Sequence, residues 1–360
     1  MSSALFPPLA PPVFASLFAG LSPTPAAALD PAAWTPDVAR RIATRRLSEH
    51  GLWIAREHSI ELPSETRDLL ETAAHTQALV AMRLRTIGAE LQQILQDRGI
   101  ESLGIKGAAV GDLHGEDLPR YYGDVDLLVS PSDFERSIEA YESEGYRPID
   151  SVSPWTRRFG SSANLSRGSG REVDVQRTIR PRCWGRRLEF GQLLHRSRVV
   201  NGTRVLGVED ALIATALAQI ADTRTNTSKL VPWRDLVVLS RIADAEVVAS
   251  IAREARLSNL VAVALNALPE DPQRVRLVGL LDSAGAMSVP TRVRFATFSH
   301  TGWTENWFVR LIREVPATQV PVAVGALVIL PPANMTTWQW WRHCVAVRER
   351  RRNAKQARRS

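Results

Sequence analysis

Two short stretches decide the fold of this chain: IKGAAV at residues 105–110 and YGDVDLLV at residues 122–129. The first is a short apolar run followed by a Lys-Gly turn and small residues, which is typical of a strand that turns into a short helix. The second is an apolar strand that carries Asp124 and Asp126. Side chains alternate between the two faces of a strand, so both carboxylates share one face. Because adjacent carboxylates repel each other, we expect that face to bind a cation.

A third carboxylate, Asp174, follows Asp126 by 48 residues and lies in another alternating apolar stretch. If the two strands are neighbours, three carboxylates converge on one face. Three oxygen ligands with open positions suit Mg²⁺, which keeps water and phosphate oxygens in its coordination sphere. Two such ions form the arrangement used in phosphoryl and nucleotidyl transfer. Asp174 could also be an ordinary surface acid.

The turn at Lys106 and Gly107 suits a triphosphate. Backbone N–H groups at the start of a helix face an anion, and Lys106 adds a positive charge. Lys106 is one of only three lysines in the chain, with Lys229 and Lys355. The alternative is that Lys106 only pairs with Glu101.

Hydrophobic periodicity predicts an α+β fold. Apolar residues at helical spacing indicate one long helix or two stacked helices over residues 64–97, ending at Gly99. Strands and short helices then alternate over residues 98–180, which predicts a mixed sheet with flanking helices. The remaining pattern predicts helices alone, at residues 208–220, 233–239, 243–256 and 260–268.

Composition is typical of a cytoplasmic globular protein. The 360 residues are 44% hydrophobic and 23% charged, and two cysteines are too few for a disulfide framework. The N-terminus lacks the basic region of a signal peptide, and the most apolar run, residues 320–330, is too short to span a membrane. The formal net charge of +7 equals the charge of residues 342–360 alone, where eight Arg or Lys face one Glu. Nucleic acid could therefore bind through this tail, although such tails are more often simply solvated.

The quoted motifs resemble the uncharacterised nucleotidyltransferase family of the DNA polymerase beta-like superfamily. The resemblance extends from the Lys-Gly-Ala-Ala turn through the strand at 124–129 to the Val-Asp-Val stretch at 173–175 and the Trp-Arg-Asp-Leu stretch at 233–236. It implies a nucleotidyltransferase-type mixed sheet, preceded by N-terminal helices and followed by an all-helical domain. We divide the chain into a Pro/Ala-rich and helical lead-in (1–63), a nucleotidyltransferase domain (64–190), a helical and Trp-rich domain (191–341) and the basic tail (342–360).

The resemblance also implies roles for individual residues. Asp124, Asp126 and Asp174 would hold two Mg²⁺ ions, and Asp174 would help to deprotonate the acceptor. Lys106, Gly107 and Arg120 would contact the NTP. Two departures concern the neighbours of these residues: Ala108 replaces a serine or glycine, and Gln176 stands where relatives usually have histidine. Trp233 and Asp235 are interpreted as core packing and a helix cap, and His114 as solvated or structural.

The leading hypothesis is a Mg²⁺-dependent enzyme that transfers NMP from an NTP to a hydroxyl of an unknown acceptor, which could be a peptide, a metabolite, a protein or RNA. Family members often lie in biosynthetic clusters for peptides, so a cluster peptide is one possible partner. The alternatives are a phosphotransferase of a peptide pathway, and a non-catalytic toxin–antitoxin or RNA-binding protein on the same fold.

Overall fold

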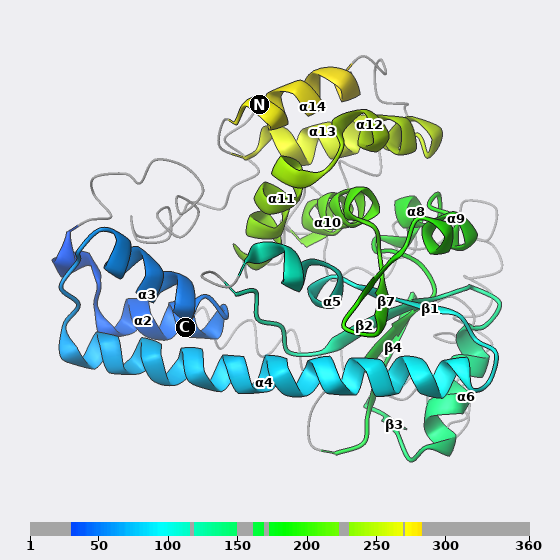
Figure 1. Ribbon diagram of the computed structural model, residues 1–360, viewed down its shortest axis with the longest axis horizontal. Helices are drawn as coiled ribbons and strands as arrows, with labels where there is room; N and C mark the ends of the chain where they lie inside the picture. The colour runs from blue at the N-terminus through cyan, green and yellow to red at the C-terminus, as the bar shows by residue number, and fades with distance from the viewer. Residues whose placement is uncertain are drawn as a thin grey trace, which may run out of the picture.

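The computed structural model describes residues 30–115, 119–149, 161–168, 173–222, 230–268 and 271–282. Its centre is a mixed seven-stranded sheet in the order β3-β4-β5-β2-β1-β7-β6 (Figure 1). The strands are β1 (Ser102–Ile105), β2 (Val125–Val129), β3 (Arg147–Pro148), β4 (Ser162–Ser166), β5 (Val173–Gln176), β6 (Arg198–Val200) and β7 (Thr203–Val205).

Strand β2 lies in the middle of the sheet. It pairs antiparallel with β1, with Ile105 opposite Asp126, and parallel with β5, with Asp126 opposite Asp174. All five residues of β2 are buried. A continuous apolar strand of this kind is expected where helices cover both faces of a sheet.

One face of the sheet packs against helices α4 (Ser64–Gln96) and α6 (Phe134–Ser143). Val125, Leu127 and Val129 of β2 belong to this core, together with Leu84, Leu91 and Leu95 of α4 and Phe134, Ile138 and Tyr141 of α6. The buried residues of α4 recur at positions 66, 70, 74, 81, 84, 88, 91 and 95, which is the stripe that a single continuous helix presents to one side. Leu79 and Met82 lie outside the stripe and are 54% and 63% exposed.

The opposite face contributes Leu103, Ile105 and Leu128 to a second core, which the C-terminal helices complete. These helices are α10 (Val208–Asp222), α11 (Leu230–Ile242), α12 (Ala245–Glu254), α13 (Ser258–Asn266) and α14 (Pro272–Asp282). Short helices α8 (Arg182–Gly185) and α9 (Phe190–His195) connect β5 to β6. The sheet therefore separates two cores.

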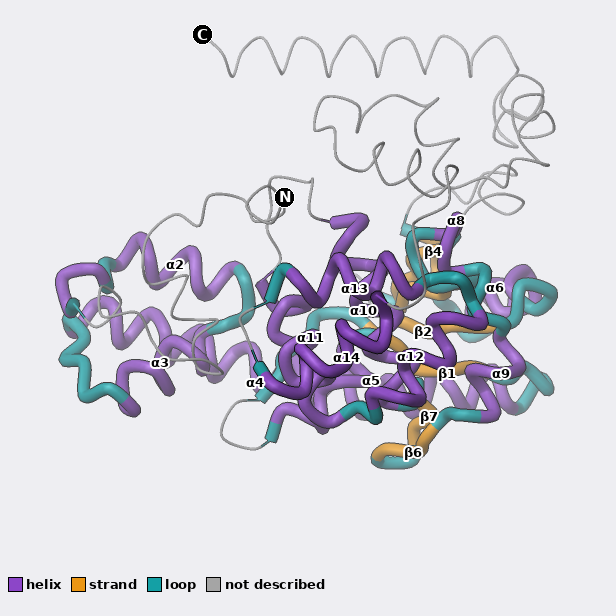
Figure 2. Tube along the Cα trace, turned by 90° about the horizontal axis from the view of Figure 1, so that it is seen from above, coloured by secondary structure: helices purple, strands orange, loops and turns teal. Residues whose placement is uncertain are grey.

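The N-terminal helices α2 (Pro36–Thr44) and α3 (Ser48–Glu57) follow a 3₁₀ turn (Pro31–Ala33) and pack on the first half of α4. Figures 1 and 2 both show them beside the end of α4 that extends beyond the sheet. Thr66 of α4 donates a hydrogen bond to the carbonyl of Trp34, a fully buried residue of this helical layer. Helix α4 thus links the N-terminal helices to the sheet.

The α+β architecture agrees with the prediction from the sequence, including N-terminal and C-terminal helices. The prediction of helices alone after residue 190 was wrong at β6 and β7, which join the edge of the sheet beside β1. These strands have three residues each, too few for periodicity to reveal them. The Trp-rich segment after residue 290 and the basic tail lie outside the described residues. In the part of the chain that the structure describes, none of the helices could cross a membrane.

Candidate active site

The site is centred on Asp126 of β2 and Asp174 of β5. Because the two strands are parallel neighbours and the two residues lie opposite each other, their side chains emerge on the same face of the sheet. Both residues are only 6% exposed. This is the face toward the C-terminal helices, whereas the residues on either side of Asp126 point toward α4.

Two side chains join these carboxylates. Gln176, two residues after Asp174 on the same strand face, donates hydrogen bonds of 2.8 Å to Asp126 Oδ1 and to Asp174 Oδ2. Lys106 Nζ forms an ion pair with Asp126 Oδ1 and lies 3.9 Å from Asp174 Oδ2. The Lys106 ammonium and the Gln176 amide therefore lie at the same two carboxylate oxygens.

Lys106 is held in an unusual backbone conformation, with φ 51° and ψ −118°, between β1 and the short helix α5 (Gly107–Val110). Positive φ is uncommon for residues with a Cβ and costs on the order of 1–3 kcal/mol. Surrounding packing has to maintain this conformation. Lys106 directly follows Ile105, which pairs with Asp126 of the neighbouring strand, and its side chain reaches that carboxylate.

The charges in the site shift each other's pKa values. The pKa of Asp126 is raised to about 7: burial raises it most, the charges of Asp124 and Asp174 add to the rise, and Lys106 lowers it. Burial would lower the pKa of Lys106, but its attraction to Asp126 and Asp174 outweighs burial and raises it. The site accordingly favours a bound positive charge.

Asp124 lies one residue before β2 and is half-buried. The described parts of the chain contain no group of three His, Cys, Asp or Glu side chains arranged closely enough to hold a metal ion. The structure thus brings Asp126 and Asp174 together, and Asp124 stands near enough to influence the pKa of Asp126 without completing a three-carboxylate set.

Gly107 and Arg120 lie beside each other, but the guanidinium of Arg120 is directed to the helical half of the protein. Its Nε and Nη2 donate hydrogen bonds to the carboxylate of Asp235 on α11, at 2.9–3.2 Å. A Cβ built at Gly107 would lie 2.5 Å from Arg120 Nη1 and 2.6 Å from Tyr122 Cβ. Only glycine fits under these two side chains without displacing them.

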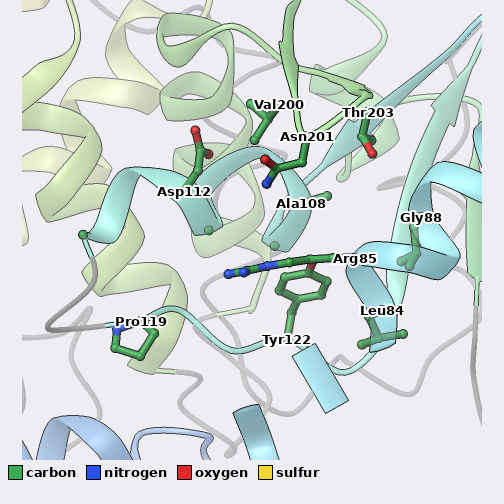
Figure 3. Close-up of a pocket in the computed structure, with 14 residues that line it drawn as sticks. Leu84, Arg85, Gly88, Ala108, Asp112, Pro119, Tyr122, Val200, Asn201 and Thr203 are labelled. Atoms are coloured by element: carbon green, nitrogen blue, oxygen red, sulfur yellow. The ribbon is translucent and has the colours of Figure 1, made fainter. Parts of the chain in front are cut away.

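A cleft of about 400 Å³ lies beside the same turn (Figure 3). Gly107 and Ala108 line it, as do Arg85 and Tyr122, and Figure 3 shows the Arg85 side chain lying across the Tyr122 ring. Neither Asp126 nor Asp174 lines this cleft, and Val125, which does, points away from the carboxylates.

Comparison with known proteins identifies the family. A family model described as uncharacterised nucleotidyltransferase matches residues 36–270, which is more than half of the chain. The chain belongs to this family. No curated protein matches. Among solved structures, an antigenic nucleotidyltransferase-like protein from Paracoccidioides brasiliensis aligns over 58% of this chain and 95% of that chain, with 20% sequence identity and a TM-score of 0.32.

The residues of this nucleotidyltransferase family member fit a divalent cation at Asp126 and Asp174. Carboxylate oxygens are the ligands that Mg²⁺ prefers. Asp174 Oδ1 is buried and has no hydrogen-bond partner within the described residues. An unpaired buried carboxylate oxygen is costly, and a metal ion would satisfy it.

Several residues of this site were not assigned from the sequence. Gln176 was noted only as a departure from the family pattern, yet it bridges both carboxylates. Arg180 is exposed and close enough for its charge to lower the pKa of Lys106. The interpretation of Asp235 as a cap was wrong, because its carboxylate accepts hydrogen bonds from Arg120 and forms one of 2.9 Å with His114 Nε2. An Arg120–Asp235 contact spans 115 positions, and no local pattern reveals it.

Proposed function

We propose that this family member is a Mg²⁺-dependent nucleotidyltransferase that moves NMP from an NTP to a hydroxyl of an acceptor, which could be a peptide, a metabolite, a protein or RNA. The observation that carries the proposal is the pairing of Asp126 with Asp174 on one buried sheet face, with Lys106 at the same oxygens. Buried carboxylates next to each other destabilise a fold, and a cation-dependent reaction explains why they are together.

Asp126 and Asp174 would hold the metal, with Asp124 near it. The ion would supply Lewis-acid stabilisation of the charge that develops on the phosphate oxygens. Gln176 fixes the orientation of both carboxylates through its two hydrogen bonds. Such outer contacts restrict the side chains to the geometry that binding needs.

The triphosphate would lie between the carboxylates and two cationic side chains. Lys106 forms an ion pair with Asp126, and Arg180 is close enough for its charge to lower the pKa of Lys106. The guanidinium of Arg120 instead binds Asp235 through two nitrogens, so we assign Arg120 a supporting role beside Gly107.

In the proposed reaction the acceptor hydroxyl oxygen attacks the α-phosphorus. A bond forms between that oxygen and phosphorus, the bond to the bridging oxygen of the β-phosphate breaks, and pyrophosphate leaves. The hydroxyl proton passes to a carboxylate, and Asp174 is the candidate, as the family resemblance implies. General-base help of this kind contributes about 10²–10⁴-fold to a rate.

The test is incubation with each α-³²P-labelled NTP, Mg²⁺ and a lysate of the host, for wild type, Asp126→Asn and Asp174→Asn. Label on an acceptor with wild type, and a loss of at least about 100-fold with either variant, supports the proposal. Asp37→Asn, whose side chain is 73% exposed on α2, is the matched control and should label like wild type.

Two further measurements make the result decisive. Mn²⁺ binding followed by electron paramagnetic resonance needs no acceptor, and it should weaken in both site variants and not in the control. Transfer of γ-label instead of α-label would contradict nucleotidyl transfer and indicate a phosphotransferase. A folded wild type that neither labels an acceptor nor binds Mn²⁺ and NTP would overturn the metal-dependent proposal.

A further inference from the structure

A buried polar cluster connects the helical half of the protein to the turn that carries Lys106. Asp235 on α11 accepts hydrogen bonds from Arg120 Nε and Nη2, the shortest being 2.9 Å, and its Oδ1 lies 2.9 Å from His114 Nε2. The side chains of Asp235, His114 and Arg120 are 3%, 0% and 10% exposed. One carboxylate thus holds two residues that lie on either side of the loop after α5.

The cluster reaches the turn through Arg120. Nitrogen Nη1, which does not bind Asp235, lies so close to Gly107 that a Cβ there would stand 2.5 Å away. Gly107 follows directly after Lys106, whose positive φ has to be maintained by its surroundings. Arg120 and Tyr122 form the wall against which this turn packs.

We propose that Asp235 is a positioning residue: by holding Arg120 and His114 it fixes the turn at Gly107, and so keeps the Lys106 ammonium at Asp126 and Asp174. The helical half would thereby contribute to the proposed active site without touching the substrate. The consequence for transfer rests on the proposed function, whereas the consequence for the position of Lys106 does not.

The electrostatics of the cluster support a rigid contact. Burial would raise the pKa of Asp235, but Arg120 and His114 together lower it to about 2. The carboxylate is therefore ionised throughout the physiological range and pairs with Arg120 through a forked geometry that restricts both side chains. A contact of this kind transmits a displacement of α11 directly to Arg120.

A second ion pair of the same geometry provides the control. Arg196 Nε and Nη2 donate hydrogen bonds of 2.8 and 2.9 Å to Asp210, which is 1% exposed at the start of α10. This pair lies in the same helical half but makes no described contact with Gly107. Asp210→Asn removes a forked ion pair whose arginine side chain is 29% exposed, and it should leave the position of Lys106 unchanged.

The experiment uses the three lysines of the chain. Wild type, Asp235→Asn, Asp235→Glu and Asp210→Asn are treated briefly with an acetylating succinimidyl ester without added metal, and peptide mass spectrometry gives the labelling rate at each lysine. Lys229 and Lys355 are the internal references. We compare the labelling rate of Lys106 with the rates of the two reference lysines. Asp235→Asn should raise this ratio about tenfold, because the Lys106 amine loses its ion pair with Asp126. Asp210→Asn should keep the wild-type ratio.

Asp235→Glu keeps the negative charge but displaces it by one methylene, and we expect an intermediate ratio. If circular dichroism shows that Asp235→Asn does not fold, the Lys106 labelling ratio of Asp235→Glu is compared with that of Asp210→Asn instead, and this comparison tests the proposal. An unchanged Lys106 ratio in a folded Asp235 variant overturns the proposal, as does an equal rise in Asp210→Asn.

The same proteins are then assayed for transfer. We expect Asp235→Asn to lower kcat at least tenfold with a smaller change in KM for the NTP, and Asp235→Glu to recover part of kcat. A merely structural role would reduce the amount of folded enzyme and leave kcat per folded molecule unchanged. If wild type transfers nothing, the proposed function fails while the labelling ratio still decides the role of Asp235.

Discussion

The two faces of the central sheet differ in composition although the same strands supply both. Toward α4 and α6, strands β2 and β5 present only Val and Leu. Toward the C-terminal helices they present Asp126 and Leu128, and then Asp174 and Gln176. The first face buries apolar area, which stabilises the fold. The second keeps like charges together in a buried place, which opposes folding and is typical of a functional site.

The largest expected effect is on the apolar face. Leu127→Ala should lower the free energy of unfolding by about 2–5 kcal/mol, because Leu127 is fully buried and its removal leaves a cavity. Urea unfolding measures this change, and transfer per folded molecule should stay at the wild-type value. Val199→Ala, at a site that is 66% exposed, is the control. If Leu127→Ala lost transfer activity without losing stability, the apolar face would not have the purely stabilising role given to it here.

The carboxyl group of Asp126 on the polar face should make the stability of the protein depend on pH. The pKa of Asp126 is raised to about 7 from an ordinary 3.8, so folding favours its protonated form. Wild type should therefore gain stability relative to Asp126→Asn as the pH falls from about 7 to about 4, by at most about 1.4 kcal/mol per pH unit.

Asp235 should change stability in the opposite direction as the pH falls. Its pKa is lowered to about 2, so its contribution to stability is present above pH 4 and is lost as the pH falls toward 2. Wild type should lose stability relative to Asp235→Asn in that lower window. Unfolding in urea with EDTA, at pH values from 2 to 8, measures both differences. If lowering the pH changed the stability difference between wild type and variant in the same direction at Asp126 and Asp235, the opposite pKa shifts given to these two residues would be contradicted.

The smallest expected effect concerns Gln176. Gln176→Met removes both amide hydrogen bonds but keeps the volume, and we expect Mn²⁺ binding to weaken about tenfold with little change in unfolding. Gln92→Met is the matched control, because the Gln92 amide bonds the backbone of Arg204 at another part of the sheet. Unchanged Mn²⁺ affinity in Gln176→Met would show that the bridge between the carboxylates has no part in binding.

Local patterns in the sequence predicted the elements that carry the site. Alternation of apolar and acidic residues predicted β2 and β5, and helical spacing predicted α4, because each pattern repeats over neighbouring positions of one element. Strands β6 and β7 were missed because they are too short to show alternation. Helical spacing did not show which side of α4 is covered: Leu79 and Met82 are apolar but lie outside its buried stripe and are exposed.

The sequence by itself determined the α+β class, the Lys-Gly turn and the place of Asp126 on a buried strand, since these depend on residues that are close along the chain. Tertiary structure alone decided that Gln176 bridges Asp126 and Asp174, that Lys106 lies at their oxygens, and that Asp235 holds Arg120. Each of these contacts depends on strand order or on the docking of α11. Packing of distant elements sets such contacts, and residue spacing along the chain does not encode them.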